Sequence, residues 1–141
     1  MATTRNARTI WEGSLLEGAG KVTLESSGLA TFDVSWPRRS EEPGGCTSPE
    51  ELIAAAHSSC FSMALSSALA KAGNPPEQLD TQAAVTFQPG EGITGVHLTV
   101  RGTVPGLTAE QFVEFAEGAK AGCPVSKALT GTTITLDAAF A

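Results

Sequence analysis

One long apolar segment constrains the fold of this chain more than any other feature. Residues 48–51 (Ser-Pro-Glu-Glu) combine a capping serine, a proline suited to the first helical position and the glutamate of a capping box. Gly73 and the prolines at 75 and 76 then stop a helix after about Ala72. The sequence therefore predicts one continuous helix across the middle of the chain.

This predicted helix is apolar on nearly every side, because it carries almost no charge between its first turn and Lys71. A helix of that kind is buried nearly all round. At about 25 residues it extends roughly 37 Å, which is longer than a single small domain can easily cover. We therefore expect a second copy of the chain to cover part of it.

The other expected elements are mostly strands, and strands and helices do not alternate regularly along the chain. This order predicts an α+β fold in one domain over residues 1–141. Ala30, Phe32, Val34 and Trp36 alternate with polar residues, as in a strand with one buried face. The expected strands cover 8–16, 20–26, 30–36, 81–87, 95–104 and 132–140, with a loop over 37–47, a helix starting at 108 and a short one near 123–124.

The charge of the chain and its N-terminal sequence indicate which partners and which cellular location to expect. The chain has 9 basic and 15 acidic residues, a formal net charge of −6, and no stripe of Lys and Arg that could bind a phosphate backbone. No apolar stretch follows the polar residues 1–9, and no apolar run approaches the roughly 18 residues that span a bilayer. We expect a cytoplasmic protein that binds neither nucleic acid nor membrane.

Three cysteines, Cys46, Cys60 and Cys123, make an odd number without a closely spaced pair. This pattern argues against a secreted disulfide scaffold and against a Cys-x-x-Cys metal site. Cys60 lies in the middle of the long helix, where it could be a small packing residue or a reactive thiol. Cys123 precedes Pro124 at a helix start, where backbone amides would lower the pKa of a thiol, although a cysteine can also occupy such a position by chance.

Four polar residues are candidates to act on these thiols. Arg38 and Arg39 follow an apolar strand, and a guanidinium there could pair with a carboxylate and stabilise a thiolate, or simply be solvated. Glu50 lies in the first helical turn, where its charge is favourable whatever its function. His57, three residues before Cys60, could act as a base or be hydrogen-bonded in the core.

Two segments together resemble the OsmC/Ohr family. Residues 47–65 (TSPEELIAAAHSSCFSMAL) resemble its signature helix without a gap, and residues 119–129 (AKAGCPVSKAL) resemble its second cysteine segment. Residues 11–13 (WEG) and 134–137 (ITLD) also agree, so the resemblance covers essentially the whole chain. The residues around both cysteines favour the OsmC branch.

The resemblance implies an OsmC-like fold with antiparallel sheets, a long buried central helix and an intertwined homodimer whose sites lie at the subunit interface. It makes Cys60 the peroxidatic thiol and Cys123 the resolving thiol. The acidic residue of the family falls on Glu50, and its arginine falls on Arg39 with Arg38 as the competitor. Cys46 has no counterpart in this pattern.

The implied activity is a thiol peroxidase that reduces organic hydroperoxides to alcohols in the response to oxidative or osmotic stress. Cys60 is too far from the helix start to benefit from its dipole, so an arginine has to stabilise its thiolate. Attack on the peroxide gives a sulfenic acid at Cys60, Cys123 condenses with it, and an external dithiol, lipoyl-type or a small thiol, reduces the disulfide. No metal or organic cofactor is expected. Apolar neighbours favour alkyl or fatty-acid hydroperoxides.

Two other functions fit parts of the pattern. His57 with Cys60, or Ser58 or Ser59 as the nucleophile, could form a hydrolase or thioesterase site, but this leaves Cys123 without a role. A thiol sensor that changes partner on oxidation would use both cysteines, but the sequence offers no DNA-binding element for its output.

Overall fold

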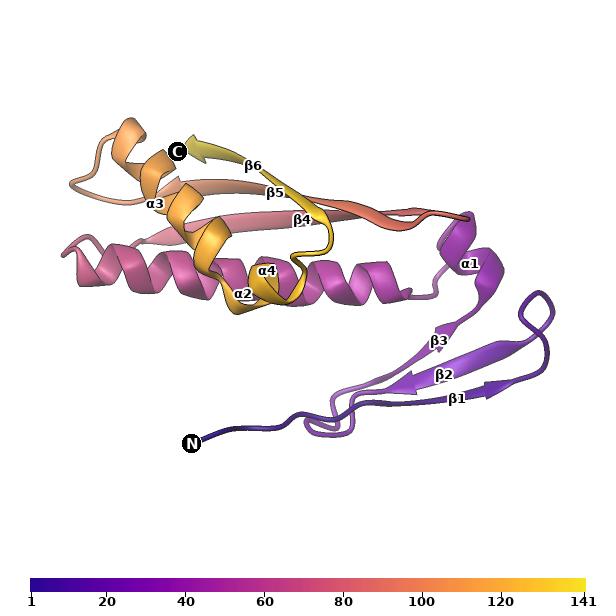
Figure 1. Ribbon diagram of the computed structural model, residues 1–141. Helices are drawn as coiled ribbons and strands as arrows, with labels where there is room; N and C mark the ends of the chain where they lie inside the picture. The colour runs from indigo at the N-terminus through magenta and orange to yellow at the C-terminus, as the bar shows by residue number, and fades with distance from the viewer. The chain divides into compact units, whose positions relative to one another are not determined.

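A computed structural model describes residues 1–141, which form two compact units within one chain. The N-terminal unit covers Met1–Pro49 and the C-terminal unit covers Glu50–Ala141. Figure 1 shows strands and a short helix in the first, and strands and three helices in the second. The α+β class is therefore confirmed, and a single domain over 1–141 stays a prediction.

The N-terminal unit is an antiparallel sheet in the order β1-β2-β3, followed by one helical turn. Its strands are β1 (Arg8–Glu12), β2 (Ala19–Thr23) and β3 (Thr31–Val34), all shorter than expected. The short helix α1 (Trp36–Ser40) occupies the start of the segment expected to be a loop, so that expectation was wrong there. The cause is local: the Ser35 side chain caps the helix by accepting a hydrogen bond from the Arg38 N–H at 3.4 Å.

This sheet has almost no hydrophobic core of its own. Val22 is its one buried apolar side chain, and every residue of β1 is exposed. The side chains left exposed include large ones: Ile10, Trp11, Leu15, Leu16 and Leu29. A small sheet needs packing on one face for stability, and the N-terminal unit does not supply it by itself.

The C-terminal unit consists of a long helix, a three-stranded sheet and a pair of helices. The elements are α2 (Pro49–Lys71), β4 (Gln78–Gln88), β5 (Gly92–Thr103), α3 (Ala109–Gly122), α4 (Pro124–Ala128) and β6 (Thr133–Phe140). β4 and β5 form an antiparallel hairpin, but β6 pairs with β5 in parallel. The expectation of antiparallel sheets was therefore wrong for β6, because α3 and α4 return the chain to the end of the sheet at which β5 begins.

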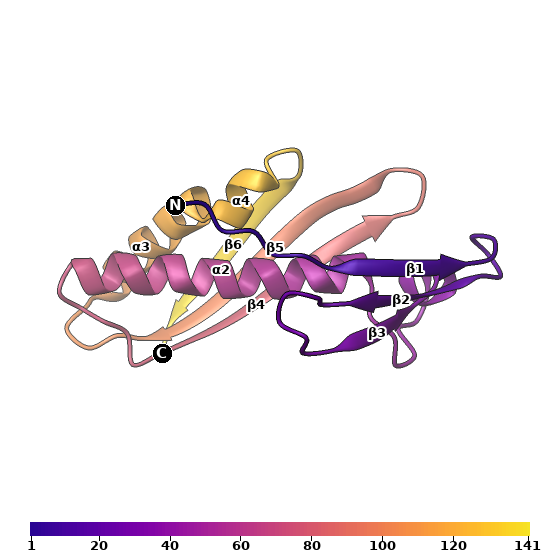
Figure 2. The same ribbon diagram turned by 90° about the horizontal axis from the view of Figure 1, so that it is seen from below.

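The core of this unit lies between α2, α3 and one face of the sheet, and Figure 2 shows α2 crossing the strands. Phe61, Leu65 and Leu69 recur every four residues on α2 and are 0% exposed. They share a cluster with alternate residues of β5 and with residues of α3: Val96, Leu98, Val100, Phe112 and Ala116. Burial of these side chains fixes the rotation of α2 about its axis.

The opposite face of α2 is not covered by the other elements of the C-terminal unit. Between the first and last turns of the helix its exposed residues are small except for Met63, which is 72% exposed, and they include Ala55, Ala56, Ser59 and Ser67. By length and composition α2 could span a membrane, with a mean hydropathy of 1.4 over 18 residues. No unbroken apolar run approaches that length, as expected, but alanines, leucines and other apolar residues keep the average of the window apolar although serines interrupt it. The side chains that α2 packs into the core are those of a domain helix.

Candidate active site

The C-terminal unit brings Cys60 and Cys123 together although 63 positions (123 − 60) separate them in the sequence. Cys60 lies in the middle of α2 and Cys123 at the junction of α3 and α4, and their thiol groups are hydrogen-bonded to each other. Both are free thiols, as is Cys46, which lies in the N-terminal unit. Two sulfur atoms in direct contact are placed for disulfide exchange.

The backbone at Cys123 explains how its sulfur is held. Its N–H donates to the Ala119 carbonyl at 2.9 Å and ends α3, while its extended conformation (φ −59°, ψ 132°) lets Pro124 start α4. The side chain of Cys123 makes no capping hydrogen bond, but the first free amides of α4, those of Val125 and Ser126, lie close enough to its sulfur to lower the pKa of the thiol. The predicted helix start beside this cysteine is confirmed.

The two thiols differ in acidity within this unit. Burial raises the pKa of Cys123, but hydrogen bonds from the Cys60 thiol, the amides of Ser126 and Val125 and the Ser126 hydroxyl outweigh it and lower the pKa overall. Burial and the contact with Cys123 raise the pKa of Cys60, and the Val125 amide only partly opposes them. Within this unit the surroundings therefore favour a thiolate on Cys123 more than one on Cys60.

The C-terminal unit places no arginine beside Cys60. Arg101 is the one arginine among residues 50–141. It is exposed on β5 between the inward-facing Val100 and Gly102, so it lies on the face of the sheet opposite to α2.

The predicted arginines lie in the N-terminal unit and differ in their surroundings. Both belong to α1. Arg38 is exposed, and its guanidinium lies against Gly44 and donates to the Glu42 carbonyl at 3.5 Å. Arg39 is half-buried. Arg38 is thus held by its own loop.

Glu50 is buried, with 7% of its surface exposed, in the first turn of α2. Ten positions separate it from Cys60 on the same helix, which corresponds to about 15 Å along the axis. Because α2 is a continuous helix, Glu50 cannot lie beside Cys60 of the same chain.

His57 is fully buried and is bonded to a residue that sequence reasoning missed. Its Nε2 lies 2.7 Å from the Oγ of Ser126, which is 3% exposed. His57 therefore pairs with Ser126, which counts against a Cys-His hydrolase dyad. The sequence does hold a signal for Ser126: it is the third residue of α4, a position from which a side chain reaches back to the capping residue, here Cys123.

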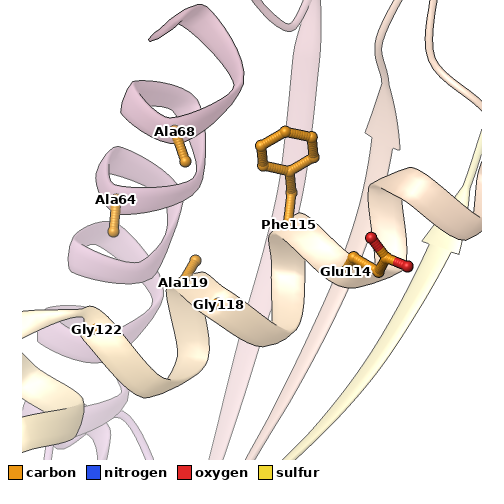
Figure 3. Close-up of a pocket in the computed structure, with 7 residues that line it drawn as sticks. All are labelled: Ala64, Ala68, Glu114, Phe115, Gly118, Ala119 and Gly122. Carbon is orange, nitrogen blue, oxygen red and sulfur yellow. The ribbon is translucent and has the colours of Figure 1, made fainter. Parts of the chain in front are cut away.

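An open groove of about 410 Å³ runs between α2 and α3 next to the cysteines. Figure 3 shows its lining, which is small or apolar apart from one carboxylate: Ala64, Ala68, Glu114, Phe115, Gly118, Ala119 and Gly122. Ala64 follows Cys60 by one helical turn, and Ala119 precedes Cys123 by one turn. The groove could accept a hydrocarbon chain close to the sulfur atoms.

Residues 42–137 match the family model described as OsmC-like protein. The chain belongs to the OsmC-like family. It is 42% identical over 140 residues to Peroxiredoxin OsmC of Escherichia coli, covering 97% of this chain and 96% of the relative. It is 30% identical over 115 residues to the organic hydroperoxide resistance protein OhrB of Bacillus subtilis, covering 80% and 83% of the two chains.

Among solved structures, the fold is similar to that of an organic hydroperoxide resistance protein from Elizabethkingia anophelis. The TM-score is 0.69 at 25% identity, and all of both chains is covered. The resemblance found in the sequence is confirmed, and the names of these relatives agree with the predicted peroxidase class.

The contact between the two sulfur atoms leads to a first prediction. Mild oxidation of the reduced protein should produce an intrachain disulfide between Cys60 and Cys123, because the thiols already touch. Peptide mapping by mass spectrometry after alkylation checks this, with Cys46 serving as the internal control that remains alkylated. Recovery of a Cys46 bridge, or of Cys60 and Cys123 both alkylated, would contradict the arrangement.

Proposed function

We propose that this protein is a cysteine-based peroxidase that reduces organic hydroperoxides to alcohols, with Cys60 as the peroxidatic and Cys123 as the resolving residue. The observation that carries the proposal is the direct hydrogen bond between these thiols. It occurs in a chain of the OsmC-like family whose curated relatives are named as a peroxiredoxin and as an organic hydroperoxide resistance protein.

The chemistry needs only the two sulfur atoms and an external dithiol. The Cys60 thiolate attacks the terminal peroxide oxygen, so that an S–O bond forms, the O–O bond breaks, and the alkoxide takes a proton to become the alcohol. The Cys123 thiolate then attacks the sulfenic sulfur, forming the disulfide and releasing hydroxide, which is protonated to water. A lipoyl-type or small dithiol reduces the disulfide and is itself oxidised.

The first step requires the negative charge to move from Cys123 to Cys60. We assign the cation that achieves this to Arg39, because a guanidinium close to a thiolate lowers the pKa of the thiol. The carboxylate of Glu50 would pair with this guanidinium and orient it. Transfer of the Cys60 proton to Cys123 leaves that proton available for the departing alkoxide.

A homodimer would complete the site. The exposed Ala- and Ser-rich face of α2 and the exposed apolar side chains of the N-terminal sheet are surfaces that a second copy could cover. Antiparallel central helices about a two-fold axis would bring Glu50 of one chain toward Cys60 of the other. The proposed setting is the cytoplasm under oxidative or osmotic stress, where dithiols are available.

The groove between α2 and α3 supports alkyl or fatty-acid hydroperoxides as the substrate class. Its apolar lining begins one helical turn from each cysteine, so a hydrocarbon chain bound there would hold the peroxide group near Cys60. Hydrogen peroxide has no apolar part and would gain nothing from this surface.

The central test compares two cysteine substitutions. Cys60→Ser should abolish hydroperoxide reduction, because serine cannot form the sulfenic acid, whereas Cys46→Ser should leave the rate nearly unchanged. Steady-state consumption of cumene hydroperoxide with dihydrolipoamide as the reductant measures both. Equal losses in the two variants would mean that the cysteines are misassigned.

Substitution of the arginines tests the source of the positive charge. Arg39→Ala should raise the pKa of Cys60 and lower the rate of peroxide attack by at least about tenfold near neutral pH, since one pKa unit is a factor of ten. The loss should diminish as the pH rises and restores the thiolate. Arg38→Ala is the matched control and should retain the wild-type profile. A loss confined to Arg38→Ala would transfer the role to that residue.

A mixed dimer tests whether one site uses both chains. Subunits carrying Glu50→Ala and Cys60→Ser are combined, so that sites completed across the interface give one site with both lesions and one with none. Such a dimer should retain about half of the wild-type activity, as expected for two independent sites related by a two-fold axis. Activity near zero would show that Glu50 and Cys60 of the same chain serve one site.

A further inference from the structure

One pair of buried polar residues in the C-terminal unit has no role in the proposed cycle. His57 is 0% exposed, and its Nε2 lies 2.7 Å from the Oγ of Ser126. The same residue, Ser126, is the third of α4, whose N-cap is Cys123, and its hydroxyl acts on the Cys123 thiol, whose pKa it helps to lower. A row of buried polar groups therefore runs from α2 through α4 to the resolving thiol.

The other nitrogen of His57 fixes the direction of hydrogen bonding in this row. Its Nδ1 is buried and has no hydrogen-bond partner. Burial lowers the pKa of His57, so the ring is neutral and carries one proton. A proton on Nδ1 would leave a buried donor unsatisfied, which costs more than an unsatisfied acceptor. The proton therefore lies on Nε2 and is donated to Ser126.

That assignment leaves the Ser126 hydrogen only one useful direction. A hydroxyl has one donor, and its oxygen already accepts from His57 Nε2. Ser126 can then donate its own hydrogen to the sulfur of Cys123. In this direction every member of the row supports a negative charge at the sulfur, and reversal would require Ser126 to donate to His57.

We propose that His57 and Ser126 form a neutral relay that holds the Cys123 thiolate for attack on the Cys60 sulfenic acid, with Ser126 donating to the sulfur and His57 as the positioning residue that orients its hydroxyl. This rests on the proposed peroxidase cycle. The step itself balances without a further reagent: the S–S bond forms, the S–O bond of Cys60 breaks, and hydroxide leaves with the electron pair.

The surroundings of Cys123 show why a neutral relay matters there. The groups of the C-terminal unit that act on its sulfur are the Cys60 thiol, the amides of Val125 and Ser126 and the Ser126 hydroxyl. The nearby cations do not reach it: Lys127 is exposed, and Lys120 pairs with Glu117 at 3.1 Å. Once peroxide converts Cys60 to the sulfenic acid, the Cys60 thiol no longer donates, whereas the Ser126 hydroxyl is unchanged by the reaction.

Titration of Cys123 alone tests the relay. In a Cys46→Ser/Cys60→Ser background, the ultraviolet absorbance of the thiolate is followed against pH. Ser126→Ala should raise the midpoint by about one pH unit, since a hydrogen bond to a charged group has about that effect. His57→Leu should shift it in the same direction, and His57→Gln, which keeps an N–H donor, should restore most of the wild-type value.

Ser62→Ala is the matched control. Ser62 is a half-buried serine on α2, and its hydroxyl lies 2.7 Å from Thr81 Oγ1. Its removal should leave the midpoint unchanged. An unchanged midpoint in Ser126→Ala, or an equal shift in Ser62→Ala, would overturn the relay. If Ser126→Ala does not fold, the contrast between His57→Leu and His57→Gln decides, because an equal shift in both would also overturn it.

A second measurement links the relay to resolution. In a Cys46→Ser background, Ser126→Ala should react with hydroperoxide at nearly the control rate but accumulate Cys60 sulfenic acid, which dimedone traps. Equal trapping in the control would overturn the relay. The two proposals fail separately: a shifted midpoint in a protein without peroxidase activity rejects the cycle alone, and an active peroxidase with an unchanged midpoint rejects the relay alone.

Discussion

The packing of α2 against β5 and α3 determines where every reactive group of the C-terminal unit lies. Phe61, Leu65 and Leu69 are 0% exposed, and truncation of any one would cost about 2–5 kcal/mol of folding free energy. Because they form a single row, they fix the rotation of the helix. Cys60 and His57 lie next to this row and are thereby directed to the junction of α3 and α4, where Cys123 and Ser126 lie.

The groups at this junction give the two thiols different pKa shifts. Amides at the start of α4 and the Ser126 hydroxyl favour a thiolate on Cys123, whereas burial disfavours one on Cys60. A peroxidase of the proposed kind needs the charge on Cys60 first and on Cys123 afterwards. The groups of the C-terminal unit therefore suit the second step of the proposed cycle, and the proposal assigns the charge for the first step to Arg39.

The sequence predicts those helices and strands whose form depends on residues close together in the chain. The capping residues before α2, the Cys123-Pro124 junction and the alternation along β5 are local signals, and all three elements form as expected. The parallel pairing of β6 depends on how α3 and α4 pack, which no local signal carries. The pairing of Ser126 with His57 was missed for a related reason: His57 lies on α2, 69 positions away, and only the folded chain brings the two together.

The hydrogen-bonded thiols also couple the redox state of this protein to its folding. A bond between Cys60 and Cys123 would close a loop of 63 positions (123 − 60), which in a chain-entropy description stabilises the folded state by about 4 kcal/mol. Thermodynamic linkage requires the same free energy to favour the disulfide in the folded chain, as a high effective concentration of one thiol toward the other. A reductant must overcome this advantage. A dithiol can match it, because its second thiol attacks within the mixed disulfide and closes a ring, which is also an intramolecular step. A monothiol cannot, because the second attack needs another molecule.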